Sequence, residues 1–156
     1  MTAAQTVTLC RVSRQKLGNP LVRHHGFQIL AVDGAPAVWT DPSKGTRIPT
    51  PIIDYNANSS LLVKSPEEFA VGHEVIAEHH TTLESGELTR RLQTIAEDQR
   101  PYDLIENNCE TKADTVVEGQ PRNRQIIEWG VLLGVVALVI GLIYWSRRST
   151  SPVPAT

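Results

Sequence analysis

Residues 102–117 read YDLIENNCETKADTVV, and in this stretch a cysteine stands at the predicted start of a helix. Asn108 is a residue type that caps helices, and Gly119 predicts the end of this one. The apolar residues after Cys109 recur on one helical face, at Ala113, Val116 and Val117. The positive end of a helix favours thiolate over thiol, and its free N–H groups can hold an oxyanion. Cys109 is therefore a candidate nucleophile with Asn108 as cap; the alternative is an inert buried cysteine.

The sequence before this helix predicts a mainly extended chain. Alternating or apolar segments bounded by turn residues predict strands at 6–12, 21–32, 37–40, 46–54, 61–63 and 73–78. A helical turn is expected at 66–69, and apolar spacing predicts a helix over 85–98 with Ser85 as its cap. Strands followed by helices favour an α+β domain with an antiparallel sheet, placed at residues 1–125.

A general base for Cys109 has to come from elsewhere in the chain. His24 and His25 are adjacent on a predicted apolar strand, so they face opposite sides and only one can point toward the cysteine. The remaining histidines, at 73, 79 and 80, lie in more polar surroundings. No spacing of cysteine and histidine matches a common structural zinc site, so we expect no metal and no cofactor.

Composition narrows the class of protein. The chain has 156 residues, of which 40% are hydrophobic, and a formal net charge of −2. That charge argues against nucleic-acid binding through a broadly positive surface. Two cysteines are too few for a disulfide framework or a four-cysteine zinc site.

Residues 129–145, WGVLLGVVALVIGLIYW, contain no charged side chain and are bounded by aromatic residues. They would extend roughly 26 Å as a helix, which predicts a transmembrane helix over residues 126–146 and a disordered tail over 147–156. Without an N-terminal signal peptide, the expected topology is a single-pass C-terminal anchor with the preceding domain in the cytoplasm. Gly130 and Gly134 form a GxxxG motif, which is compatible with a homodimer through this helix.

Several segments together resemble the lecithin retinol acyltransferase-like proteins. HHGFQIL at 24–30 is similar to their HHG strand, and YDLIENNCE at 102–110 is similar to their YNLLxNNCEHF segment. The stretches 65–80 and 119–126 also follow the family pattern in the same order. The resemblance implies a circularly permuted papain-like fold, shared with NlpC-like peptidases, in which Cys109 carries an acyl group as a thioester.

The resemblance also implies roles for the histidine pair. His24 would be the base, as the first histidine of the HHG motif, and His25 would face away from the thiol. The family's third catalytic residue follows a DG turn, where this chain has Trp39 at the best-aligned position, with Thr40 and Asp41 as possible substitutes after a register shift. An indole cannot accept a proton or orient an imidazole as a carboxylate does.

A second departure follows the cysteine. The family's NCEHF reads here as Asn108, Cys109, Glu110, Thr111 and Lys112, so the histidine and phenylalanine are missing.

Three functions are compatible with the sequence. The first is a membrane-anchored thiol acyltransferase or phospholipase-type hydrolase that takes phospholipid or another acyl donor. The second is a cysteine peptidase or amidase of the same fold, and the third is a catalytically weakened, membrane-anchored adaptor.

Overall fold

The computed structural model describes residues 4–55, 60–103, 108–122 and 124–149. The chain divides into two compact units, Met1–Asn123 and Arg124–Thr156.

The first unit contains the strands and the shorter helices. Its strands are β1 (Thr6–Lys16), β2 (Asn19–Val32), β3 (Ala35–Pro36), β4 (Val38–Thr40), β5 (Arg47–Pro49), β6 (Ile52–Tyr55), β7 (Leu61–Lys64) and β8 (Ile76–Glu84). Its helices are α1 (Pro66–Ala70), α2 (Ser85–Ala96) and α3 (Cys109–Glu118).

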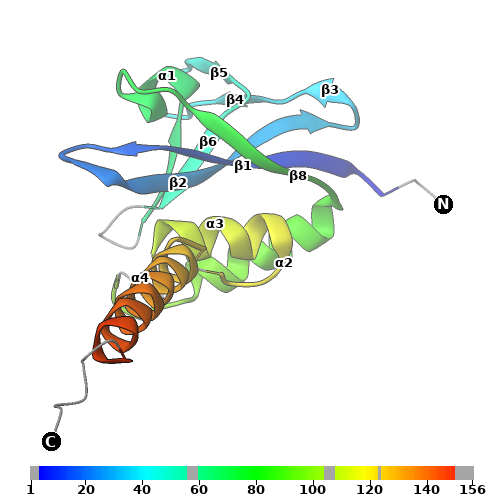
Figure 1. The fold of residues 1–156 in the computed structure, drawn as a ribbon. Coiled ribbons are helices and arrows are strands. Elements are labelled where there is room, and N and C mark those ends of the chain that lie inside the picture. Colours follow the sequence, from blue (N-terminus) through cyan, green and yellow to red (C-terminus); the bar gives the residue numbers. More distant parts are fainter. Residues whose placement is uncertain (1–3, 56–59, 104–107, 123, 150–156) are drawn as a thin grey trace, which may run out of the picture. The chain divides into compact units, whose positions relative to one another are not determined.

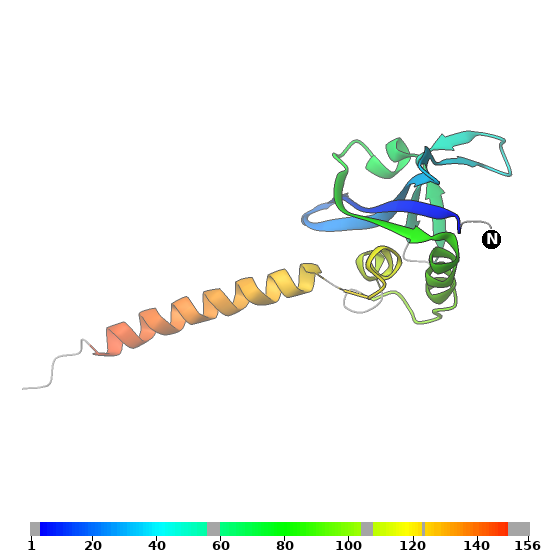
Figure 2. The same ribbon diagram turned by 90° about the vertical axis from the view of Figure 1, so that its right-hand side faces the viewer.

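One antiparallel sheet organises this unit, in the order β7-β6-β2-β1-β8, with the short β3 paired to β2. β4 and β5 form a separate two-stranded sheet. Helices α2 and α3 cover one face of the main sheet, whereas α1 and the β4–β5 pair lie on the other side (Figures 1 and 2). The predicted α+β class with an antiparallel sheet is confirmed.

Successive side chains of the two central strands, β1 and β2, point to opposite faces of the sheet, and they contribute to an apolar core on each face. On the face covered by α2 and α3, the buried residues are Val7, Leu9, Phe27, Leu88, Ile95, Val116 and Val117. On the opposite face they are Cys10, Val12, Ile52 and Phe69. The long strands β1 and β2 are thus buried on both faces, which makes them a rigid support for side chains on either side.

Several element boundaries differ from the sequence-based expectation; β1, for example, continues to Lys16, and the predicted segment 46–54 forms the two strands β5 and β6. β8 continues through His79 and His80 to Glu84, because it pairs with β1 over most of its length as an edge strand. A polar edge strand lacks the apolar pattern that predicts strands. Helix α2 begins at Ser85 itself, with Glu84 as an N-cap whose side chain makes no capping hydrogen bond.

The second unit contains helix α4 (Arg124–Ser149). Among the residues that the structure describes, no helix is both long enough and apolar enough to cross a membrane. This finding overturns the predicted transmembrane helix over 126–146. The predicted disordered tail, 147–156, is also corrected at its start, because α4 continues to Ser149; residues 150–156 lie outside the described residues.

Candidate active site

The pairing of β2 with β6 brings a histidine and a carboxylate together. Gly26 on β2 lies opposite Asp54 on β6, so Asp54 and His24 share a face and are diagonal neighbours. His24 Nε2 is 2.7 Å from Asp54 Oδ1, which is hydrogen-bonding distance. Because Nε2 is engaged in this way, Nδ1 is the ring nitrogen left for the thiol.

A lysine from the next strand completes the surroundings of Asp54. Ile52 pairs with Lys64 in the register of β6 and β7, which places Lys64 diagonally beside Asp54 on the same face. The Lys64 ammonium donates a hydrogen bond to Asp54 Oδ2. Burial alone favours the neutral carboxyl, but the hydrogen bonds and charges of His24 and Lys64 outweigh it and lower the pKa of Asp54. The carboxylate is 1% exposed and ionised.

The glycine of the HHG motif has a packing role. A Cβ at Gly26 would lie 2.9 Å from the Ile53 carbonyl oxygen and 3.2 Å from Phe69 Cε2. No larger residue fits there without displacing the β6 backbone. Phe69 in turn stacks on the His24 ring, with 5.7 Å between centroids and 28° between planes. Gly26 therefore lets two neighbours lie close to β2: the backbone of β6, which carries Asp54, and the Phe69 ring, which stacks on the imidazole.

Helix α3 presents Cys109 at its first position. Asn108 is the N-cap, and its side chain accepts a hydrogen bond from the Thr111 backbone N–H at 3.0 Å. The paired stretch of β2 and β6 starts at Gly26, and the backbone N–H of the preceding His25 donates to Cys109 Sγ at 3.5 Å. Cys109 is 6% exposed. The thiol thus lies at the end of the β6 pairing, beside the histidine pair.

A buried ion pair fixes α3 against the sheet on the same side as His25. Arg11 on β1 contacts Asp114 Oδ1 at 2.6 Å, and its guanidinium lies 3.9 Å from Glu110 Oε1. All three side chains are almost fully buried. Arg11 also contacts Glu78 Oε2 on β8 at 2.5 Å, so its buried guanidinium joins β1, β8 and α3 and holds the helix against the sheet.

The charges of Cys109 and His24 support each other. Burial raises the pKa of the thiol, but hydrogen bonding and charge from His24 outweigh it and lower the pKa of Cys109. Burial likewise disfavours the imidazolium, yet the hydrogen bond to Asp54 and the interactions with Cys109 raise the pKa of His24 to about 9. A thiolate beside an imidazolium is the charge state of an activated cysteine nucleophile.

The residues predicted from sequence are only partly brought together. The structure joins Cys109 and His24 and places Asn108 as a cap, whereas Thr40 lies on the separate strand β4 and Asp41 in the turn between β4 and β5. Asp41 there accepts hydrogen bonds from Ser43 and Lys44.

Asp54 stands in their place beside the imidazole, and the sequence analysis missed it. A usable signal was present, because Asp54 is a carboxylate at the end of the apolar run Pro51-Ile52-Ile53, on an expected extended segment. A charged residue of this kind is costly to bury unless it is paired.

Within the described ranges, no three residues of the histidine, cysteine, aspartate or glutamate types are grouped to hold a metal ion. The second cysteine, Cys10, is buried on β1, and burial raises its pKa to about 11. It is therefore a neutral thiol at physiological pH.

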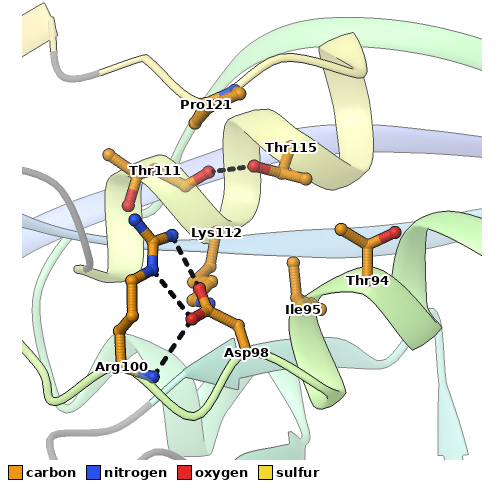
Figure 3. Close-up of a pocket in the computed structure, with 8 residues that line it drawn as sticks. All are labelled: Thr94, Ile95, Asp98, Arg100, Thr111, Lys112, Thr115 and Pro121. Atoms are coloured by element: carbon orange, nitrogen blue, oxygen red, sulfur yellow. Dashed lines mark hydrogen bonds and ion pairs between the residues drawn. The ribbon is translucent and has the colours of Figure 1, made fainter.

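A small pocket of about 120 Å³ lies between the end of α2 and the first turns of α3 (Figure 3). Asp98 stands between the side chains of Arg100 and Lys112 and contacts both (Figure 3). The other lining residues are Thr94, Ile95, Thr111, Thr115 and Pro121. The carboxylate of Asp98 is paired with both cations of this pocket, and its ion pair with Lys112 attaches the segment after α2 to α3.

No known protein family, curated protein or solved structure matches this chain. The resemblance to the lecithin retinol acyltransferase-like proteins and the permuted papain-like architecture it implies therefore stay predictions.

Proposed function

We propose that this protein is a cysteine-dependent acyltransferase or acyl hydrolase that forms a thioester on Cys109. The observation that carries the proposal is the line of side chains from the Cys109 thiol through His24 to the buried carboxylate of Asp54. The nucleophile, the proton carrier and the group that orients the proton carrier each come from a different element. This is the arrangement that thiol acyl transfer requires.

The chemistry follows from the charge states. The Cys109 thiolate attacks the acyl carbon, and the carbonyl electron pair moves to oxygen. The tetrahedral intermediate then collapses, and the leaving group takes the proton from the His24 imidazolium. In the second half, neutral His24 removes a proton from water or from an acceptor alcohol or amine, which attacks the thioester and releases the thiolate. Asp54 stays ionised and holds the ring throughout.

The class of acyl donor is taken from the sequence resemblance. HHG at 24–26 and NNCE at 107–110 are similar to motifs of proteins that transfer acyl chains of lipids. We therefore propose a phospholipid ester as the first donor to test. A peptide amide is the corresponding substrate if the protein acts instead as a peptidase or amidase.

The test is incubation with p-nitrophenyl butyrate and with a short-chain phosphatidylcholine, followed by mass spectrometry of the Cys109 peptide. We expect an acyl mass on Cys109 and turnover that the Cys109→Ala variant lacks. His24→Ala should lower kcat by about 10²-fold or more, the scale of a positioned acid–base group.

The matched control is Cys10→Ala, because Cys10 is the other buried cysteine and has no imidazole partner among its described contacts. This variant should keep turnover. Adducts with a peptide amide alone would favour the peptidase function. Absence of any Cys109-dependent turnover across ester, phospholipid and amide donors would contradict the proposal and favour an adaptor.

A further inference from the structure

A tyrosine hydroxyl lies at the nucleophile, from a segment that the mechanism above does not use. Tyr102 follows helix α2, and its hydroxyl donates to Cys109 Sγ across 4.0 Å. The hydroxyl therefore lies beside the sulfur at the start of α3, where the backbone N–H groups of its first turn are found.

This location is where an oxyanion would form. When the sulfur attacks a carbonyl carbon, the carbonyl oxygen becomes negative one bond away from that carbon. The N–H of Cys109, at the first position of the helix, has no acceptor within the helix and can donate to that oxygen. The Tyr102 hydroxyl donates to the attacking sulfur itself, so it is within reach of an oxygen two bonds away from that sulfur.

The ring of Tyr102 is held in place from two sides. It stacks on Tyr55, with 6.3 Å between centroids and 22° between planes, and the Lys112 ammonium lies 5.2 Å from the centre of the Tyr55 ring. Lys112 is also paired with Asp98, which fixes the segment that leads to Tyr102 against α3 (Figure 3). A donor that is positioned before the reaction costs no reorganisation when charge develops.

The hydroxyl also keeps its proton. Burial is the largest cause that raises the pKa of Tyr102, and the charge of Cys109 adds to it. Tyr102 is therefore an O–H donor throughout the range in which the thiolate and imidazolium coexist.

We propose that Tyr102 is a catalytic residue that supplies the second donor of the oxyanion hole, together with the backbone N–H of Cys109. The inference rests on the proposed acyl-transfer function. As the carbon–sulfur bond forms, the hydroxyl turns from sulfur to the oxyanion and donates to it. As the carbonyl re-forms and the bond to the leaving group breaks, the hydroxyl returns, and its proton is never transferred.

The experiment compares Tyr102→Phe with Tyr55→Phe. Both substitutions keep the ring stack and remove one hydroxyl, but the Tyr55 hydroxyl has no hydrogen-bond partner within the described structure. With p-nitrophenyl butyrate we expect Tyr102→Phe to lower kcat by about 10²-fold, the scale for one oxyanion donor, with KM nearly unchanged. Tyr55→Phe should lower kcat far less than Tyr102→Phe, because it keeps the ring that stacks on Tyr102.

Alkylation by iodoacetamide separates an oxyanion role from a structural one. Alkylation displaces iodide from a saturated carbon, so no oxyanion forms, and the rate reports the thiolate alone. At a pH where the thiolate is fully formed, Tyr102→Phe should be alkylated at Cys109 as fast as the unchanged protein. The expected result is therefore lost acylation with retained alkylation.

Each other outcome overturns the inference in a recognisable way. Turnover of Tyr102→Phe equal to or faster than that of the unchanged protein would show that the hydroxyl is no oxyanion donor. A parallel loss of acylation and alkylation would assign Tyr102 to the thiol or to packing. Absence of Cys109-dependent turnover in the unchanged protein would instead remove the proposed function and the oxyanion role with it.

Discussion

His24 owes its charge at neutral pH to two neighbours that are distant in sequence, Asp54 and Cys109. Burial by itself would favour the neutral imidazole, whereas the Asp54 carboxylate at 2.7 Å and the interactions with Cys109 together reverse that preference. Asp54 in turn is kept ionised although it is buried, because His24 and Lys64 satisfy both of its oxygens. The reactivity of Cys109 thus depends on a carboxylate with which it shares no strand or helix.

Replacing Asp54 with Asn removes the negative charge and keeps the shape. The imidazolium is present below the pKa of His24 and is lost as pH rises through it, so turnover should fall on the alkaline side near pH 9. In Asp54→Asn that pKa should drop toward its ordinary value of about 6.5, and the alkaline limb of kcat/KM should move to lower pH. The measurement is the pH profile of kcat/KM.

The control for this experiment is Asp41→Asn, because Asp41 is the carboxylate that the sequence offered as a possible third catalytic residue. It lies on the β4–β5 turn and bonds to Ser43 rather than to the imidazole. Its replacement should leave the pH profile in place. A profile that moves with Asp41 and not with Asp54 would reverse the assignment of the third residue.

Helix α3 carries the nucleophile, its N–H groups and the charges that attach it to the sheet. Its first turn is closed by a reciprocal capping arrangement, in which Asn108 accepts from the Thr111 N–H and donates its own N–H to Thr111 Oγ1. Its body is held by the buried contact between Arg11 and Asp114. Because the start of the helix sets the position of Cys109, the Asn108 cap should affect both the stability of the domain and the reactivity of the thiol.

Asn108→Ala should lower the free energy of unfolding by about 1 kcal/mol, the usual cost of a lost N-cap, and should slow alkylation of Cys109. Asn108→Ser is the matched variant, because serine caps helices nearly as well, and it should recover most of the stability. Urea denaturation followed by circular dichroism gives the comparison. Equal stability of the alanine and serine variants would contradict a capping role.

At the scale of the whole molecule, the chemistry belongs to one of the two units. The sheet, both apolar cores, and the Cys109, His24 and Asp54 side chains all lie within residues 1–123. Helix α4 belongs to the other unit, which spans residues 124–156. The first unit therefore contains what it needs to fold and to form the thiolate–imidazolium pair.

A chain that ends at Asn123 should unfold cooperatively in urea, and its Cys109 should be alkylated at the rate of the full-length protein. The reason is that no group in the described site or cores comes from residues 124–156. The measurements are the denaturation curve and iodoacetamide labelling with mass-spectrometric readout. A non-cooperative transition, or labelling of Cys109 no faster than that of buried Cys10, would contradict this division.

Local sequence was sufficient for several elements. The caps and apolar spacing around Cys109 predicted α3 to within a residue, and the turn residues Asp33 and Gly34 predicted the end of β2. Such signals are local because helix caps and tight turns are made by residues close in the chain. The candidate nucleophile and the histidine pair were likewise visible in two short segments.

The tertiary structure decided the rest. It selected Asp54 over Thr40 and Asp41 and placed Tyr102 at the thiol, and no helix spacing or strand alternation contains that information. These contacts depend on the register of β2 with β6 and on the attachment of α3 to the sheet, which join residues tens of positions apart. Local propensity determines which elements form, whereas the pairing of distant strands determines which side chains meet, because register is fixed only when the whole sheet is packed.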